Sequence, residues 1–108
     1  GKTNGQLLRA DIVLDEPGRR VLRDGRSVEL TETEFEILCF LAARRGSVVS
    51  VEQIYEGVWH EKYMPSSTNT VMVHIVNLRK KLEDDPAQPK YIQTVRGAGY
   101  RMAAPAAK

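Results

Sequence analysis

Apolar and polar positions divide the chain into a β-rich beginning, a helical middle and a β-rich end. The first thirty residues contain three short runs typical of strands, "LLRADIVLD", "RRVLRD" and "RSVEL", separated by the turn sequences "EPG" and "DG". Near the chain end, "YIQTV" and "YRMA" flank "RGAG". This pattern predicts a three-stranded antiparallel meander at about 8–30 and a β-hairpin around "RGAG".

Helices are expected between these β-rich parts, because apolar residues recur there at helical spacing after helix start signals. The first begins after Thr31, because Thr31 as N-cap and Glu34 three residues later have the spacing of a capping box. The second follows the same pattern at Ser50 and Gln53 and covers about 51–58.

The third expected helix, at about 67–85 behind the cap candidates Ser66 and Ser67, has two faces of different chemistry. One narrow face is apolar and is assigned to the core: Val71, Ile75, Leu78 and Leu82. The opposite face carries amides, β-branched side chains and a positive charge: Asn69, Val73, Val76, Asn77 and Lys80. Thr70, His74 and Lys81 lie along one flank, and Arg79 lies on the other.

The polar face of this helix has two interpretations. A merely solvated face usually mixes Glu with Lys, whereas this one carries no acidic residue before Glu83. Asn side chains can bond adenine N6 and N7, and Val or Thr can contact a thymine methyl in the major groove. Composition alone leaves open a DNA-reading face and an ordinary solvated face.

Charge is distributed unevenly over the 108 residues, whose net charge is +2. Residues 1–65 hold nine Lys/Arg and eleven Asp/Glu, whereas residues 66–108 hold seven Lys/Arg and three Asp/Glu. A basic second half points to a polyanionic partner. We expect no cofactor and no metal site, because neither histidine has a second ligand at metal spacing.

The remaining composition bounds the context of the chain. A single cysteine, Cys39, excludes an internal disulfide, fits a reducing cytoplasm, and is expected to be a small buried hydrophobe. No apolar run approaches the roughly 20 residues of a membrane span. Because the chain begins with Gly, we expect a fragment, with one domain at 8–102 and disordered ends at 1–7 and 103–108.

The segment "RGAGYR" allows several interpretations. A dinucleotide or phosphate loop fails on context, because Met102 ends the motif and no helix follows it. A plain hairpin explains Gly97 and Gly99 as turn residues but gives Arg96 no role. A winged helix-turn-helix explains all three, with Arg96 held into or beside the minor groove of DNA.

Three segments carry a resemblance to a known family: "LTETEFEIL", "NTVMVHIVNLRKKLE" and "YIQTVRGAGYRM". At these spacings, the chain from about Leu8 to Met102 resembles the effector domains of two-component response regulators of the OmpR/PhoB class. The resemblance implies an α+β winged helix-turn-helix, with an N-terminal antiparallel sheet, three helices and a C-terminal hairpin wing. It also implies sequence-specific binding of double-stranded DNA, usually by a head-to-tail pair on direct repeats.

The resemblance implies contacts from both recognition elements. On the third helix it implies phosphate contacts by Thr70 and His74, a base-methyl contact by Val73, and a phosphate or base-edge contact by Arg79. On the wing it implies a minor-groove contact by Arg96 and positions that abut the DNA backbone at Thr94, Gly97 and Tyr100.

The chain departs from the family on the outer face of the third helix. Several members carry arginines where this chain has Asn69, Val76 and Asn77. We therefore expect direct base readout by Asn77, of adenine, and contact of Val73 with a thymine methyl. Lys80 is expected to contact phosphate.

The resemblance also implies partners other than DNA. The loop "WHEKYMPSS" is similar to one that in this family can contact RNA polymerase, which singles out Trp59, His60, Glu61, Lys62 and Tyr63. For Trp59, burial against the core is the competing expectation. A phosphoacceptor receiver domain, with its sensor kinase, is implied before Gly1.

Two other classes of function were weighed. A protein-interaction module on the same scaffold is the alternative, because fold alone does not decide function. An enzyme is not expected, because the sequence shows no nucleophile–base pair, paired carboxylates or cofactor loop, and a domain this small should lack a pocket. The acidic run "EDD" at 83–85 is interpreted as a solvated helix end.

Overall fold

The computed structural model describes residues 6–9 and 12–103. Nine elements follow one another: β1 (Gln6–Arg9), β2 (Ile12–Asp15), β3 (Arg20–Arg23), β4 (Arg26–Val28), α1 (Glu32–Ala43), α2 (Val51–Trp59), α3 (Ser67–Leu82), β5 (Ile92–Val95) and β6 (Gly99–Met102). The expected disordered ends lie largely outside the described residues. Their inner margins are ordered, because Gln6 and Leu7 pair in β1 and Ala103 is buried.

The N-terminal sheet has four antiparallel strands in the order β1-β2-β3-β4, so the prediction of three strands was wrong. The run "LLRADIVLD" is divided between β1 and β2, which pair Gln6 with Leu14 and Leu7 with Val13. Nine residues exceed the usual strand length of about five or six, and the polar "RAD" separates two apolar halves. This run therefore folds back on itself rather than forming one strand.

Both turn signals of this sheet are confirmed. Asp24 and Gly25, with φ values of 51° and 81°, form the two-residue connection between β3 and β4. Two positive φ angles are the requirement of a type I′ hairpin turn, which matches strand twist. In the "EPG" turn, the Asp15 carboxylate accepts a hydrogen bond from the Gly18 backbone N–H at 3.1 Å.

The predicted caps of the first two helices are present. The Thr31 hydroxyl accepts from the Glu34 N–H at 3.2 Å, and the Glu34 carboxylate accepts from the Thr31 N–H at 3.0 Å. Ser50 and Gln53 form the same reciprocal pair at 3.0 and 2.9 Å. Because each box satisfies N–H groups that have no partner inside the helix, these caps set where α1 and α2 begin.

The third helix begins at Ser67 as predicted, but its cap and its C-terminal end differ from the prediction. Ser66 makes no side-chain cap, and the Ser67 hydroxyl instead accepts from the Met64 N–H at 3.2 Å. The helix ends at Leu82 rather than at residue 85, because Glu83 is extended. Pro86 follows closely, and the residue before a proline is disfavoured in helical conformation.

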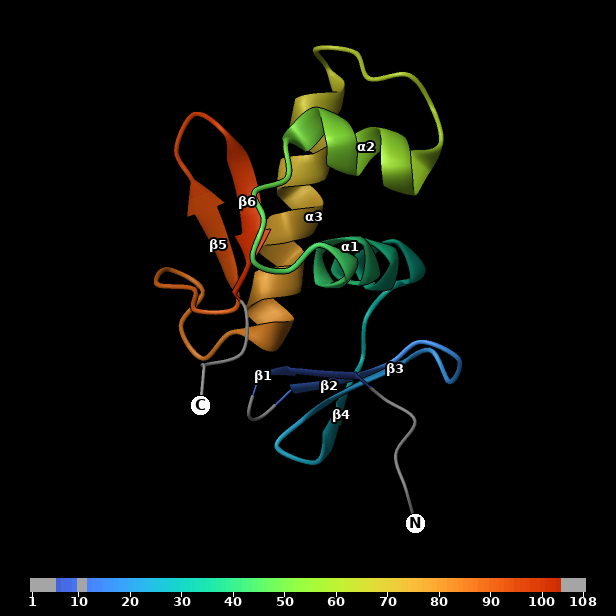
Figure 1. The fold of residues 1–108 in the computed structure, drawn as a ribbon, viewed down its shortest axis with the longest axis vertical. Coiled ribbons are helices and arrows are strands. Elements are labelled where there is room, and N and C mark those ends of the chain that lie inside the picture. Colours follow the sequence, from blue (N-terminus) through green and yellow to red (C-terminus); the bar gives the residue numbers. More distant parts are fainter. Residues whose placement is uncertain (1–5, 10–11, 104–108) are drawn as a thin grey trace.

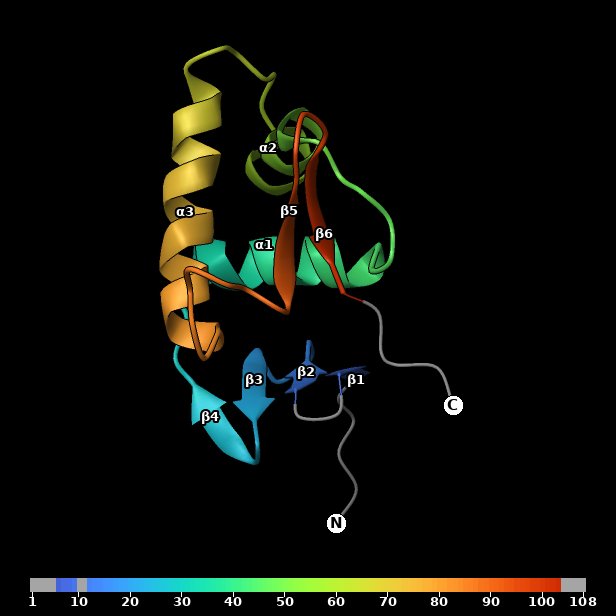
Figure 2. The same cartoon turned by 90° about the vertical axis from the view of Figure 1, so that its left-hand side faces the viewer.

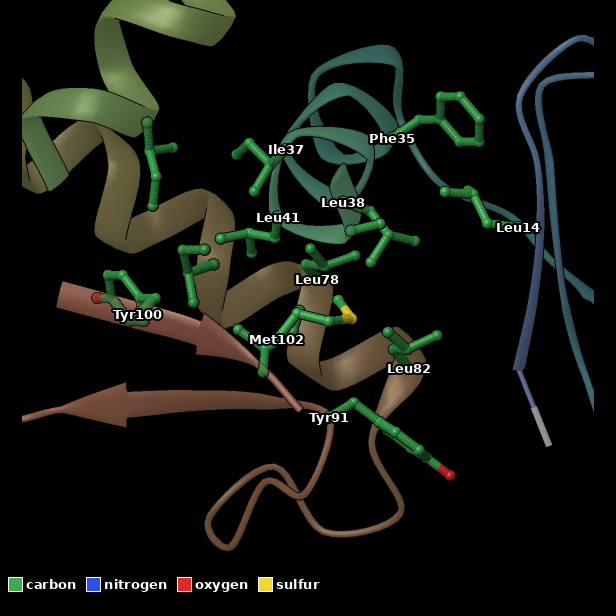
Figure 3. Packing of buried hydrophobic residues seen from close by; sticks show 14 of the residues in the cluster. Leu14, Phe35, Ile37, Leu38, Leu41, Leu78, Leu82, Tyr91, Tyr100 and Met102 are labelled. Carbon is green, nitrogen blue, oxygen red and sulfur yellow. The ribbon is translucent and has the colours of Figure 1, made fainter. Parts of the chain in front are cut away.

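The core lies where the helices meet the C-terminal hairpin. The assigned apolar face of α3 is confirmed, since Val71, Ile75, Leu78 and Leu82 are at most 1% exposed. Figure 3 shows Tyr100 and Met102 of the hairpin turned toward the helices, while Leu14 of the sheet reaches Phe35 of α1. Each fully buried side chain of this size stabilises the fold by about 1.5–3 kcal/mol.

The elements are arranged so that the sheet and the hairpin tip lie at opposite ends. In Figures 1 and 2 the sheet β1–β4 forms the lower end, while the β5–β6 tip, α2 and the first turn of α3 form the upper end. None of the helices in the described chain is long and apolar enough to cross a bilayer.

The hairpin is attached to the residues before α2. Val49 donates to the Tyr100 carbonyl at 2.7 Å, and Tyr100 donates to the Val49 carbonyl at 2.8 Å. Val49 and Tyr100 thus form a single antiparallel β-bridge. Gly99 permits it, because a Cβ there would lie 2.1 Å from the Val49 carbonyl oxygen.

Candidate nucleic-acid interface

The outward face of α3 presents apolar groups and amides together. Val73 and Val76 are each 47% exposed, and Met72 is 45% exposed. Asn69 and Lys80 are also exposed, whereas Asn77 is half-buried. Helical spacing places Met72 on the same face, one turn from Asn69 and Val76, although the sequence analysis did not single it out. This face offers methyl contacts and amide hydrogen bonds to whatever it meets.

Thr70 lies in the first turn of α3 and His74 lies at the middle of the helix, and both are half-buried. His74 Nδ1 lies 2.8 Å from the Thr70 carbonyl oxygen. A carbonyl only accepts, so Nδ1 carries the ring proton, and a neutral ring then has an unprotonated Nε2. His74 can therefore donate to a phosphate through Nε2 only when the imidazole is doubly protonated.

An aromatic cluster joins α2 to α3. Trp59 is half-buried against the core, stacks on Tyr55 with ring centroids 5.1 Å apart, and meets the His74 ring edge-on at 5.3 Å. Tyr63 adds an edge contact with Tyr55 at 6.3 Å. The expected core packing of Trp59 is present, and the same side chain fixes the orientation of His74.

Hydrogen bonds hold the loop between α2 and α3. His60 ends α2 in the left-handed conformation, with φ of 60°. Glu61 accepts from the Tyr55 hydroxyl at 3.1 Å, and the Tyr63 hydroxyl is hydrogen-bonded to the Thr68 hydroxyl. Lys62 is exposed. The loop therefore presents His60, Glu61 and Lys62 on a fixed backbone.

Arg79 is directed to the wing. Its Nε and Nη2 donate to the Ile92 carbonyl at 3.0 and 2.8 Å, and Nη2 also donates to the Thr94 hydroxyl at 2.8 Å. The guanidinium carbon lies 5.5 Å from the centre of the Tyr100 ring. Burial lowers the pKa of Arg79, but not enough to remove its charge near neutral pH. These bonds engage Nε and Nη2 of the guanidinium. The contact of Arg79 with DNA that the resemblance implies stays a prediction.

The interpretation of "EDD" as a solvated helix end was wrong for Glu83, which is 5% exposed. Its carboxylate accepts backbone N–H groups from Lys90 at 2.8 Å, from Tyr91 at 3.2 and 3.0 Å, and from Ile92 at 2.8 Å. No signal in the sequence separates Glu83 from its acidic neighbours. The reason is tertiary: the chain after Pro89 returns beside the end of α3 and donates its backbone N–H groups to the Glu83 carboxylate.

The tip of the wing leaves its arginine available. Arg96 is exposed and, among the described residues, has no hydrogen-bond or ion-pair partner. Gly97 has φ of 74° and open space where a Cβ would lie, and Ala98 closes the turn on the Val95 carbonyl at 2.9 Å. A narrow tip with one free cation can enter a groove that a bulkier loop cannot.

The other wing positions differ in accessibility. Thr94 is exposed, although its hydroxyl accepts from Arg79. Tyr100 is 8% exposed and packs in the core, so little of its side chain is open to a DNA backbone. Arg101 pairs across the hairpin with Gln93 at 3.1 Å. Arg96 is thus the wing residue best placed to reach a partner.

Only part of the basic run "RKK" remains free. Lys81 forms an ion pair at 2.6 Å with the buried carboxylate of Glu34, which ties α3 to α1. Arg79 is engaged with β5, as described above. Lys80 is exposed and, within the described residues, has no such partner, so it is the member of the run available for phosphate.

Chemistry other than binding finds little support in the described residues. The expectation of no pocket was wrong, since two grooves exist, both open to solvent: one between β3–β4 and the end of α3, the other between the wing and the start of α3. No group of three His, Cys, Asp or Glu in the described ranges could hold a metal ion. Cys39 is half-buried, and burial raises its pKa to about 12, so it carries a thiol at neutral pH.

Residues 25–102 match the family model described as "Transcriptional regulatory protein, C terminal". The chain belongs to this family. It spans less than half the length of the curated relatives it matches. The regulatory protein VanRc of Enterococcus gallinarum is 53% identical over 76 residues, which cover 70% of this chain and 32% of VanRc.

Solved structures agree with this assignment. The response regulator DrrB of Thermotoga maritima, an OmpR/PhoB homologue, is 38% identical with a TM-score of 0.75, over 88% of this chain and 42% of DrrB. The DNA-binding domain of Klebsiella pneumoniae RstA, solved in complex with the RstA box, is 29% identical with a TM-score of 0.84, over 93% and 97%. The predicted winged-helix fold and OmpR/PhoB-type effector domain are confirmed.

Proposed function

We propose that this domain binds double-stranded DNA sequence-specifically, as the effector domain of a two-component transcription regulator. The observation that carries the proposal is the common direction of two recognition elements. The wing tip, which carries the exposed Arg96, and the first turns of α3 lie at the same end of the molecule (Figures 1 and 2). The comparison with RstA, whose related domain was solved on DNA, supports the proposal.

In the proposed complex, α3 lies in the major groove. Asn77 bonds an adenine edge, and Val73 contacts a thymine methyl. Thr70, His74 and Lys80 contact phosphates and thereby fix the register without reading sequence. Asn69 lies on the same exposed face and completes the set on α3.

The wing reads the adjoining minor groove in this proposal. Arg96 carries the contact, because its guanidinium suits the negative potential of a narrow, A/T-rich groove. Thr94 and Gly97 lie against the sugar–phosphate backbone beside it, where the missing side chain of Gly97 permits close approach. In this proposal, Tyr100 and Arg79 support the wing from the side that faces the helices.

Further partners belong to the same proposal. We place the RNA polymerase contact at the loop after α2, with Trp59 and Tyr63 as its inner supports and residues 60–62 as its exposed part. We expect a monomer that binds one half-site weakly, and a full-length protein that pairs on direct repeats when a receiver domain dimerises. The working compartment is the cytoplasm, where chromosomal target DNA is found.

Selection from random-sequence duplex DNA tests the proposal, with the wild-type domain beside Asn77→Ala and Arg96→Ala. We expect half-sites about one helical turn apart, relaxed at one base pair by Asn77→Ala. Arg96→Ala should weaken preference at A/T steps outside that base pair. No enrichment at low salt would contradict DNA binding and would favour a protein-docking module, for which Met72, Val73 and Val76 would be the apolar contact.

A further inference from the structure

Arg79 of α3 and Glu83, the residue directly after this helix, hold the backbone of the wing. Arg79 and Glu83 stand four positions apart, and therefore about one turn apart on one side of the helix. Ile92, the first residue of β5, is bound by both: its N–H donates to Glu83 at 2.8 Å, and its carbonyl accepts from Arg79 at 2.8 and 3.0 Å. The first residue of β5 is thus clamped at both its N–H and its carbonyl group.

The clamp is built for rigidity. Glu83 is 5% exposed and receives four hydrogen bonds from the backbone of residues 90–92. Hydrogen bonds to charged groups are shorter and stronger than neutral ones, and removing one partner leaves buried N–H groups unsatisfied. Arg79 adds a planar, two-pronged contact that a lysine ammonium cannot reproduce.

The two wing strands are attached to different elements. On β6, Tyr100 forms the bridge with Val49, and the Met102 carbonyl accepts from Gly46 at 2.9 Å. On β5, the buried Ile92 side chain joins the core, and the hydrogen bonds to the end of the helical part come from Arg79 of α3 and from Glu83 directly after it. The position of the wing relative to α2 and its position relative to α3 therefore depend on separate contacts.

Small movements at the clamp are enlarged at the tip. Extended chain from Ile92 to Val95 covers roughly 13 Å, so a rotation of about 10° at Ile92 displaces Arg96 by roughly 2 Å. Recognition geometry tolerates only about 0.5 Å. The contact that holds β5 on α3 is accordingly the one that sets the distance between Arg96 and the base-reading face of the helix.

We propose that Arg79 and Glu83 are positioning residues for sequence reading: they fix the offset between the minor-groove step contacted by Arg96 and the major-groove bases contacted by α3. This inference rests on the proposed function. In this inference Arg79 acts by holding Ile92 with its planar guanidinium. The resemblance instead implies that the charge of Arg79 contacts DNA directly.

A double-mutant cycle on the selected half-site separates these roles for Arg79. Arg79→Lys keeps the charge and loses the planar contact, and Lys80→Ala serves as a control that removes a free cation one residue away. We expect Arg79→Lys to weaken binding about as much as Arg96→Ala, on the order of tenfold. In an Arg96→Ala background, Arg79→Lys should add less than about twofold, whereas Lys80→Ala should cost the same in both backgrounds.

Sequence preference supplies a second readout that a general loss of stability would not produce. Arg79→Lys should relax preference at the minor-groove positions and leave the bases read by α3 unchanged. Wild-type affinity of Arg79→Lys for DNA would overturn the inference and show that Arg79 has no role in binding. An equal loss of affinity in the wild-type and Arg96→Ala backgrounds would also overturn it, in favour of a direct contact between Arg79 and DNA.

The Glu83 half of the clamp is measurable without DNA. Glu83→Gln keeps the shape of the side chain and removes its charge. We expect amide hydrogen exchange to accelerate at residues 90–92 and along the wing, with α1 and α2 unchanged. Unchanged wing exchange would overturn the clamp. Failure of the wild-type domain to bind any DNA would instead overturn the proposed function, whatever the exchange result.

Discussion

The two β-structures of this domain are both antiparallel and both carry arginines, but Arg20 and Arg23 of the sheet differ from Arg96 of the wing tip in having ion-pair partners. In the N-terminal sheet, Arg20 pairs with Asp15 at 3.2 Å, and Arg23 pairs with Asp84. At the wing tip, Arg96 has no such partner in the described part of the chain. A paired surface arginine belongs to the scaffold, whereas an unpaired one on a narrow turn keeps its charge for a polyanion.

The two structures also differ in what surrounds the glycine at or beside each hairpin turn. The Asp24–Gly25 turn stands in open space, with no atom within 4 Å of a Cβ built at Gly25. At Gly99, by contrast, the backbone of Val49 and Ser50 fills the place of a side chain. The wing is therefore constrained by tertiary contact and the sheet turn by local geometry, and the predictions below test this contrast.

The largest effect is expected for Gly99→Ala. Its φ of 141° is a region that non-glycine residues rarely adopt, and the new Cβ would lie 2.1 Å from the Val49 carbonyl oxygen. We expect a loss of at least about 3 kcal/mol in the free energy of unfolding, measured by urea denaturation. Gly97→Ala is the matched control, with φ of 74° and open space, and should cost about 1 kcal/mol. Equal losses in the free energy of unfolding for Gly99→Ala and Gly97→Ala would contradict the idea that tertiary contact constrains the wing.

The next largest effect is expected for Arg96→Ala, with Arg20→Ala as the comparison. We expect a loss of about 1–3 kcal/mol in DNA-binding free energy for Arg96→Ala, because a groove contact disappears. Arg20→Ala should leave binding within about 0.5 kcal/mol, since that cation belongs to an ion pair at the opposite end of the molecule. Fluorescence anisotropy on one half-site at fixed salt measures both, and similar losses would show nonspecific attraction.

Replacing thymine by deoxyuridine in the selected site sharpens the comparison within α3. Each substitution removes one methyl, which should cost about 0.8 kcal/mol where Val73 covers it and nothing elsewhere. Val73→Ala should abolish that sensitivity, whereas Met64→Ala, an exposed apolar residue outside the helix, should preserve it. An unchanged affinity on every uracil-substituted duplex would exclude methyl readout.

The smallest effect is expected for the ion pair between Glu34 of α1 and Lys81 of α3. Burial acts to raise the pKa of Glu34, but hydrogen bonds from Lys81 and the Thr31 backbone hold it below its ordinary value of 4.5. Its stabilising contribution is therefore present above about pH 4.5 and is lost as pH falls through the lowered folded-state pKa.

Glu34→Gln keeps the capping pattern and removes this titration. We expect the variant to be less stable than wild type near neutral pH by about 0.5 kcal/mol, with the difference narrowing below pH 4. Thermal unfolding between pH 3 and 7 measures it. A difference that stays constant with pH would show that the charge of Glu34 is not the stabilising feature.

Much of the fold was predictable because its signals are local. The caps at Thr31 and Ser50 satisfy N–H groups within three residues, and the Asp24–Gly25 turn depends on its own φ angles. The apolar face of α3 follows from helical period alone. For the same reason the exposed candidates, Val73 and Arg96, were identified before any tertiary contact was known.

Tertiary structure decided the rest, because the same side chain has different roles depending on which segment returns beside it. The sequence by itself determined three helices, a terminal hairpin and a basic, amide-bearing outer face. Only the folded chain divided its first apolar run into two strands, buried Glu83 beneath residues 90–92 and directed Arg79 to Ile92. Backbone N–H groups that lack a partner in their own element must find one elsewhere, and where that partner comes from is a property of the whole fold.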